Sequence, residues 1–330
     1  MKKLKKLFLP VLIIVLSFSV VACGTNQTAA TAASGNAKVN YPTKEVKVIV
    51  PSDAGSVPDL AIRALAEGFK QETGQALVVE DVPGGAQVPG TVKMAKSASD
   101  GYTLGILPSG VLNLRPLLQQ VEFKFPEDFT PIVGVGDYQI NFAARKDAPY
   151  NTVAEMVKYY KDKNQAVTVA TSGVNTASHL VMEMLVKQTG LQYRHLPNDS
   201  GSKVLTALLG GHADIAIANL ADVYAQVKKG DVKILGVPAE SRYENLKDVP
   251  TLKEQGIDVV GSPTFDIYAP KNLPKDIADK LTNVFLKSMD SDQFKQFVTN
   301  TNMTITKTAP DKLIPQLQQG QKDYQKVLQK

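Results

Sequence analysis

Residues 46–73, VKVIVPSDAGSVPDLAIRALAEGFKQET, contain the pattern that decides the fold. The β-branched residues at 46–50 predict a strand, and apolar residues on one face of 58–73 predict a helix that stops at Gly74. The loop between them, residues 51–59, is rich in small residues. A strand, a loop and a helix in this order are the repeating unit of α/β proteins.

The same alternation continues along the chain. Further strands are predicted at 77–80, 102–107, 140–145, 167–171, 193–196, 215–218 and 234–237. Helices are predicted at 92–97, 153–162, 176–189, 202–209, 222–229, 277–289, 293–298 and 311–328. This alternation favours parallel sheets with helices on both faces, and the chain from residue 41 onward is long enough for two α/β domains.

The first 22 residues have the pattern of an export signal. Four lysines in residues 1–6 precede an apolar stretch at 7–21, which is shorter than the roughly 20 residues that span a bilayer. Small residues then precede Cys23, the only cysteine, in an arrangement that resembles the lipobox of bacterial lipoproteins. That resemblance implies acylation of Cys23 after removal of residues 1–22. An ordinary secretory signal with an incidental cysteine is the alternative.

Residues 23–40 are predicted to be a lipid-anchored flexible tether. They are mostly Ala, Thr, Ser, Gly and Asn, which cannot bury enough surface to fold, and their reach is about 20 Å. Removal of residues 1–22 leaves 33 basic and 32 acidic side chains, so the formal charge of +5 belongs largely to the signal. The mature chain therefore gives no support to a nucleic-acid partner.

Three loops that follow predicted strands are candidates for a ligand site, because open α/β sheets bind ligands beyond the carboxyl ends of their strands. Backbone N–H groups, the positive end of a helix and hydroxyl groups bind anions without a charged side chain. Turn formation and helix capping are the alternative explanation of each loop. The candidate ligand-binding residues in these loops are Ser52, Asp53, Ala54, Gly55, Ser56, Asp59, Gly84, Gly85, Thr171, Ser172, Gly173, Thr176, Ser178 and His179.

Motifs of common enzyme classes are missing from the sequence. It has no G-x-S-x-G, no G-x-x-x-x-G-K-[ST] and no G-x-G-x-x-G after a strand. His179, His195 and His212 lie in separate predicted elements without metal-ligand spacing, so a structural role is expected of each. We therefore expect a protein that is not an enzyme and that needs neither a metal nor a cofactor.

Several segments resemble the solute-binding components of tripartite tricarboxylate transporters, the Bug-type receptors. Residues 41–51 have that family's usual start, and the segment at 178–180, SHL, resembles the end of its SSGxGSxxHL motif. DGYTL at 100–104, FTP at 129–131 and LLGGHAD at 208–214 correspond to its PDGYTLL, DFTPI and LLGGQVD. The resemblance extends from residue 41 to near the C-terminus.

The resemblance implies a two-lobed periplasmic-binding-protein fold of type II, with residues 41–138 and 262–330 in one lobe and 139–261 in the other. Hinges are expected near 137–141 and 256–263. It also implies a monomeric extracytoplasmic lipoprotein that captures a small carboxylate and delivers it to integral membrane transporter subunits. The remaining residues of the expected ligand-binding set are Ser109, Asn198, Asp199, Asn219 and Phe265, with a core position as the alternative for Phe265.

Two loops depart from the family pattern in ways that make the expected cleft less cationic. DV at 81–82 stands where Asn-Arg is common, and NDS at 198–200 where Tyr-Lys-Gly is common. The resulting hypothesis is a ligand with fewer carboxylates, or one with an amine or hydroxyl that contacts Asp53, Asp199 or Asp214. A sensory receptor of the same fold and an extracellular α/β hydrolase are the alternatives to a transport function.

Overall fold

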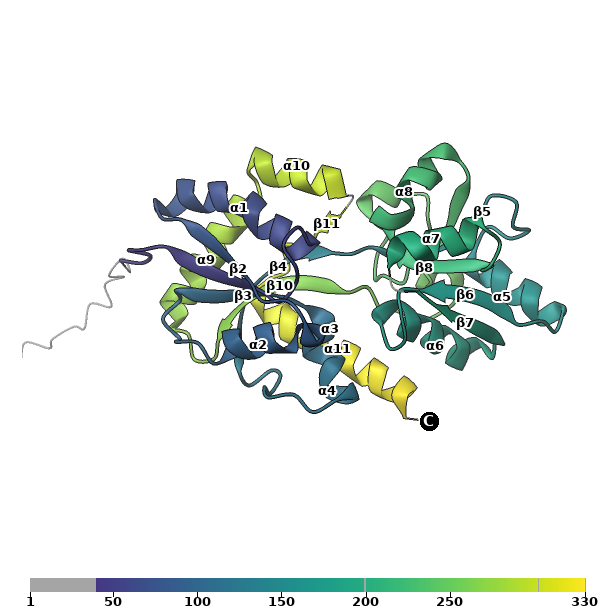
Figure 1. Ribbon diagram of the computed structural model, residues 1–330, viewed down its shortest axis with the longest axis horizontal. Coiled ribbons are helices and arrows are strands. Elements are labelled where there is room, and N and C mark those ends of the chain that lie inside the picture. Colours follow the sequence, from purple (N-terminus) through teal and green to yellow (C-terminus); the bar gives the residue numbers. More distant parts are fainter. Residues whose placement is uncertain (1–39, 199, 302, 330) are drawn as a thin grey trace, which may run out of the picture. The chain divides into compact units, whose positions relative to one another are not determined.

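The computed structural model describes residues 40–198, 200–301 and 303–329. The predicted signal, Cys23 and the tether up to residue 39 lie outside these residues, as does Asp199. The described chain has two sheets with helices on both faces of each (Figure 1). We call the six-stranded sheet with its helices the first lobe, and the five-stranded sheet with its helices the second lobe. The residue bounds expected for the two domains stay a prediction.

The sheet of the first lobe has the strand order β11-β4-β10-β3-β1-β2. Its strands are β1 (Val46–Val50), β2 (Leu77–Asp81), β3 (Thr103–Pro108), β4 (Phe129–Asp137), β10 (Thr264–Pro270) and β11 (Thr304–Ile305). Strands β1, β2 and β3 are parallel, whereas β10 is antiparallel to both β3 and β4. The expectation of purely parallel sheets was therefore wrong, because β10 returns from the second lobe and enters the sheet in the opposite direction.

Helices cover both faces of this sheet, and alternate side chains of β1 explain why. Val48 packs with Leu65 and Phe285 on one face, and Ile49 packs with Met94 on the other. Burying a large apolar side chain stabilises the fold by about 1.5–3 kcal/mol, so both faces need a cover. The helices of this lobe are α1 (Val57–Thr73), η1 (Gly85–Gln87), α2 (Val88–Ala95), α3 (Ser109–Asn113), α4 (Arg115–Leu118), α9 (Lys275–Ser288), α10 (Asp292–Thr301) and α11 (Pro310–Leu328).

The sheet of the second lobe has the order β7-β6-β8-β5-β9. Strands β6, β7 and β8 are parallel, and β5 is antiparallel to β8 and β9. Its strands are β5 (Ile140–Arg145), β6 (Val167–Thr171), β7 (Tyr193–Pro197), β8 (Ile215–Asn219) and β9 (Val232–Gly236). Its helices are α5 (Val153–Asp162), α6 (Ala177–Thr189), α7 (Gly201–Leu209), α8 (Leu220–Lys229), η2 (Glu244–Leu246) and η3 (Lys253–Gln255).

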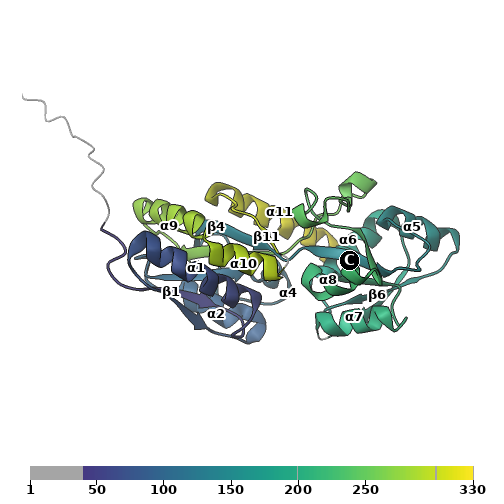
Figure 2. The same cartoon turned by 90° about the horizontal axis from the view of Figure 1, so that it is seen from above.

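Two chain segments cross between the lobes, and the C-terminal helix packs against both. The chain passes from β4 to β5 through residues 138–139 and returns to β10 through the stretch that precedes residue 264. The C-terminal helix α11 contacts both lobes (Figure 2). Its Leu317 packs in the first lobe against Phe129, while Tyr324 and Val327 pack with Leu180 of α6 in the second lobe.

Candidate ligand-binding site

A cavity of about 230 Å³ lies between residues of the two lobes. Pro108 ends β3, Ser172 follows β6 and Asn219 ends β8, so the cavity lies at the carboxyl ends of strands from both sheets. Its polar lining residues are Gln87, Tyr138, Ser172, Ser178, Asn219 and Asp222. The other lining residues are Pro108, Gly110, Ile140, Ala177, Gly201, Val204, Ala218 and Pro263. The position is the one that open α/β folds use for ligands.

The loop from Thr171 to Ser178 supplies hydroxyl groups at the start of α6. Thr176 caps this helix by accepting a hydrogen bond from the backbone N–H of His179 (3.4 Å). Ser178 Oγ lies 3.0 Å from Thr176 Oγ1 and 3.3 Å from Ser172 Oγ. Two serine hydroxyls therefore border the cavity beside the N-terminus of a 13-residue helix, where the helix dipole favours an anion.

Two stacked histidines make hydrogen bonds to this loop. The rings of His179 and His195 lie 4.0 Å apart and within 10° of parallel. His179 Nδ1 accepts a hydrogen bond from the backbone N–H of Asn175, and His195 Nε2 shares a hydrogen bond of 2.7 Å with Thr171 Oγ1. Burial, with a smaller contribution from His179, lowers the pKa of His195 and so favours its neutral form. The structural role expected of these two histidines fits this arrangement, but the sequence did not show that they meet.

The remaining candidates of the second lobe position the loop rather than line the cavity. Thr171 is fully buried, and Gly173 adopts φ +133°, a conformation that favours glycine. The backbone N–H of Asn198 donates to the carbonyl oxygen of Thr171 (2.9 Å), and its side chain donates to Leu196. Of the expected set in this lobe, Ser172, Ser178 and Asn219 border the cavity, whereas Thr171, Gly173, Thr176, His179 and Asn198 do not.

The first lobe contributes less to the cavity than its small-residue loops suggested. Ser52 accepts a hydrogen bond from Gln87 Nε2 (3.1 Å), and it is Gln87 that borders the cavity. Asp59 is buried, accepts a hydrogen bond from the backbone N–H of Gly55 (2.7 Å) and pairs with Arg63 (2.7 Å), which holds the turn that precedes α1. The candidates in this lobe that do not line the cavity are Ser52, Asp53, Ala54, Gly55, Ser56, Asp59, Gly84, Gly85 and Ser109.

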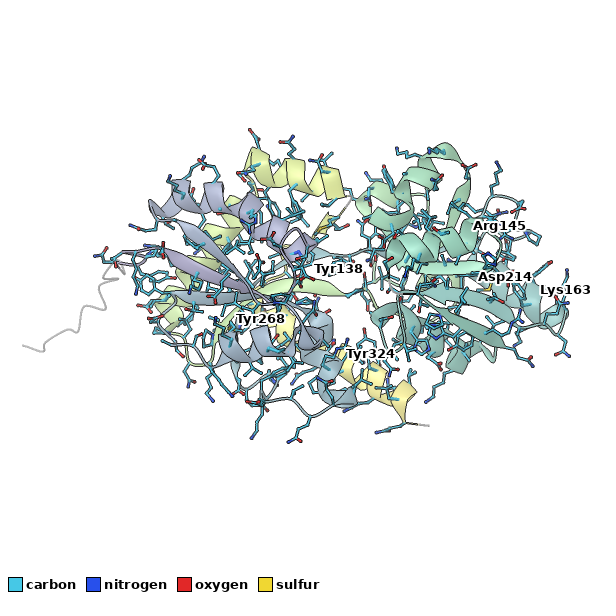
Figure 3. The ribbon with its side chains drawn as sticks, viewed as in Figure 1. Tyr138, Arg145, Lys163, Asp214, Tyr268 and Tyr324 are labelled. Carbon is cyan, nitrogen blue, oxygen red and sulfur yellow. The ribbon has the colours of Figure 1, made fainter. Side chains whose placement is uncertain are left out.

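Phe265 is corrected from a cleft residue to a core residue. Its side chain has no exposed surface, and its ring lies 5.2 Å from that of Tyr138 in the core of the first lobe. The strand β10 points this side chain inward because residues alternate between the two faces of a sheet. It is Tyr138, at the crossover labelled in Figure 3, that borders the cavity.

Of the acids proposed as amine contacts, Asp214 lies away from the cavity. Asp214 precedes β8 and accepts a hydrogen bond from the backbone N–H of Thr168 (2.8 Å). It lies about 16 Å along the strand from Asn219, at a rise of about 3.3 Å per residue, and therefore at the opposite end of the sheet (Figure 3). Asp53 is exposed and outside the lining, and Asp199 is outside the described residues. The acid that does border the cavity, Asp222, was missed.

The two interlobe strands are linked to each other by hydrogen bonds. The hydroxyl of Ser262 donates to Asp137, and the backbone N–H of Tyr138 donates to Pro263 (3.1 Å). Tyr243 lies 2.9 Å from Ser262 Oγ. Loss of hydration raises the pKa of Asp137 to about 6. The contacts of Asp137 and Tyr138 with Ser262 and Pro263 join the two segments in which hinges are predicted, and the hinge motion itself stays a prediction.

A second cavity, of about 530 Å³, borders α6, α11 and residues 258–260. Several charged groups on its wall are already paired, including Lys253 with Glu240 (2.6 Å) and Lys326 with Asp323 (2.8 Å). It lies away from the strand ends that favour ligand binding.

Across the described ranges, no set of His, Cys, Asp and Glu side chains could hold a metal ion. None of the helices in those ranges has the length and apolar character needed to cross a bilayer.

Comparison with known proteins identifies the family. The sequence pattern of the tripartite tricarboxylate transporter family receptor, TctC, matches residues 61–330. The chain belongs to this family. Its members are receptors of a transporter rather than a class of enzymes. A relative from Cupriavidus necator, named the UPF0065 protein in the gbd 5′ region, is 30% identical over 282 residues, which cover 83% of this chain and 86% of the relative.

Solved structures confirm the fold of this TctC-family receptor. A TctC solute-binding protein from Polaromonas, without ligand, superposes with a TM-score of 0.81 at 26% identity, covering 87% of this chain and 99% of that one. MatC from Rhodopseudomonas palustris, with bound malate, has a TM-score of 0.67 at 22% identity, covering 88% and 100%. A second protein of that organism, with adipate, has a TM-score of 0.68 at 22% identity, covering 87% and 97%. The predicted family and the two-lobed fold class are therefore confirmed.

Proposed function

We propose that this receptor captures a small carboxylate in the cavity between its lobes and delivers it to the membrane subunits of a tripartite transporter. The observation that carries the proposal is the pair of hydroxyls, Ser172 and Ser178, at the N-terminus of α6 and on the cavity wall. They offer hydrogen-bond donors where the helix dipole favours a negative charge. The cavity of about 230 Å³ suits a metabolite smaller than the drug-sized ligands of larger pockets.

Two further observations support a carboxylate. Asn219 places a side-chain amide on the same wall, which adds a neutral donor to the hydroxyls. Malate and adipate occupy two proteins of the same fold, and both are small carboxylates. Binding by neutral donors also fits a cavity whose described lining contains no Lys, Arg or His.

The proposal is tested by calorimetric titration of a soluble chain that starts at Gly24, with small mono- and dicarboxylates, amino acids and neutral sugars as controls. The chain has no tryptophan, so calorimetry or an extrinsic dye is needed. A ligand at 100 times its Kd should raise the free energy of unfolding by about 2.7 kcal/mol. The acid should be recovered chemically unchanged. Absence of binding by every acid, or conversion of the acid to a product, would contradict the proposal.

The membrane location is the second part of the proposal. We infer that Cys23, which lies outside the described residues, carries a lipid that anchors the protein outside the cytoplasm. The apolar stretch before it and the small residues around it support this inference. Cys23→Ser should release the protein from the membrane fraction and abolish incorporation of labelled palmitate, while Ser34→Ala in the tether should change neither. A Cys23→Ser protein that stays membrane-bound after a salt wash would contradict the anchor.

A further inference from the structure

The charges in the cavity are unusual for a site that takes only anions. Among the described residues on its wall, Asp222 is the only carboxylate, and no Lys, Arg or His is present. A ligand carboxylate can meet hydroxyls and a helix N-terminus there, but a second ligand carboxylate would share the cavity with Asp222. Two like charges 4 Å apart repel by about 4 kcal/mol at an effective dielectric constant near 20.

Asp222 is half-buried on the cavity wall. It lies in the first turn of α8, where the backbone and side-chain N–H groups of Asn219 act to lower the pKa of its carboxylate. A Cβ atom on Gly201 would lie 2.1 Å from the Asp222 carboxylate, so any other residue at position 201 would displace this carboxylate from its present position. The start of α7 and the carboxylate of Asp222 are therefore in close contact, and both border the cavity.

The N–H groups of Asn219 do not offset the hydration that the Asp222 carboxylate has lost. Burial raises the pKa of Asp222 despite their opposing effect. A cationic partner would stabilise the ionised form, and the described part of the cavity wall provides none. Helix capping explains why an acceptor oxygen is useful at this position, but asparagine would serve that purpose without a charge.

The carboxylate of Asp222 and the hydroxyls of Ser172 and Ser178 lie beyond neighbouring strands. Ser172 follows β6, and Asp222 follows β8, which pairs with β6 in parallel. All three residues also border the same cavity of about 230 Å³, so the anion-binding end and the acidic end belong to one small space. A single small molecule can reach both ends if it carries opposite charges a few bonds apart.

On the basis of the proposed function, we propose that the receptor selects a small zwitterion, an amino acid whose protonated amine pairs with Asp222 and whose carboxylate binds at the N-terminus of α6. Asp222 is then the residue that determines specificity. A simple dicarboxylate places its second negative charge beside Asp222, whereas an amino acid places its positive charge there.

The test uses matched ligand pairs that differ only in the amine: alanine with propionate, 4-aminobutyrate with butyrate, and glutamate with glutarate. Each is titrated at neutral pH and constant ionic strength into the wild type, Asp222→Asn and Asp231→Asn. Asp231 is a 45%-exposed partner of Lys146 on the same lobe and serves as the matched control. For at least one pair, the wild type should bind the amino member at least tenfold more tightly, and Asp222→Asn should reduce that ratio at least tenfold. Asp231→Asn should keep the wild-type ratio.

The outcomes separate this inference from the proposed function. Tight binding of dicarboxylates by the wild type without any preference for the amine, or an amine preference that survives in Asp222→Asn, would overturn the role of Asp222 and leave carboxylate capture standing. Failure of every acid to bind the wild type would overturn both. Circular dichroism and the Tm of Asp222→Asn report whether α8 stays folded. Should that variant unfold, Asp222→Ser provides the same comparison, and the wild-type ratios alone already decide the amine preference.

Discussion

Ser172→Asp should weaken binding of the ligand carboxylate by about 1,000-fold, which corresponds to about 4 kcal/mol for two like charges 4 Å apart at an effective dielectric constant near 20. Ser172 borders the cavity beside the start of α6, and its side chain is exposed, so the larger aspartate fits without displacing core atoms. The new carboxylate would lie next to the N-terminus of α6, where a negative charge stabilises the helix. The fold should therefore be kept while the anion site is lost.

Val174→Asp is the matched control for this variant. Val174 is 62% exposed, lies in the same loop and is not among the described residues on the cavity wall. It receives the same charge, yet ligand affinity should change less than about threefold because solvent screens charges that are exposed and apart. Calorimetric titration of both variants with the best wild-type ligand gives the comparison. Equal losses in the two variants would mean that the anion does not bind at Ser172.

Asp266→Asn should stabilise the protein by an amount that grows as the pH rises. Asp266 is fully buried on β10, and its Oδ2 accepts a hydrogen bond from Thr264 Oγ1 (2.8 Å). Its Oδ1 is buried without a hydrogen-bond partner among the described residues. Burial raises the pKa of Asp266 to about 7. The folded protein thus holds this proton more tightly than the unfolded chain, in which the pKa is about 3.9.

The direction of the pH dependence of stability follows from this difference in proton binding. Between about pH 4 and pH 7 the folded state binds more protons at Asp266 than the unfolded state, so wild-type stability from this residue falls as the pH rises. Asp266→Asn has no proton to lose. Its advantage in the free energy of unfolding should grow by about 2.6 kcal/mol from pH 5 to pH 8. Urea unfolding of both proteins at the two pH values measures this change.

Asp290→Asn is a control for which the change in stability should have the opposite sign. Asp290 is an exposed partner of Lys307 (2.5 Å), and this ion pair lowers the pKa of Asp290. Its replacement should therefore cost a little stability at neutral pH, and the cost should fade as the pH falls and Asp290 becomes protonated. A stability difference for Asp266→Asn that is the same at pH 5 and pH 8 would show that Asp266 keeps its ordinary pKa in the folded protein.

Most helices and strands that have a clear local pattern of apolar residues were predicted from the sequence. The strands at 46–50, 140–145 and 167–171 and the helix at 153–162 have the predicted bounds. Strands β4 and β10 were missed because Pro131, Gly134 and Gly136 weaken the strand pattern of the first and Asp266 that of the second. Their conformation comes from tertiary pairing with each other, which a local pattern does not contain.

The predicted ligand-binding residues border the cavity only in part, for a similar reason. Ser172 and Ser178, in the small-residue loop after β6, border it, whereas the equally small residues after β1 form a turn around Asp59. Composition alone does not separate these two cases. Asp222 was not among the predicted residues because it looks like an ordinary acidic residue in the first turn of a helix, and only the three-dimensional structure brings it to the cavity wall.

The central position of β10 has a consequence for how the protein is made. This strand lies between β3 and β4, yet it is synthesised after the whole second lobe. Until residue 270 has been exported, β3 and β4 have no strand between them, and their backbone groups are open to pairing with other chains. The second lobe, whose strands all come from residues 140–236, can complete its sheet first. Newly exported chains should therefore depend on protection of the N-terminal segment from aggregation until their last third has arrived.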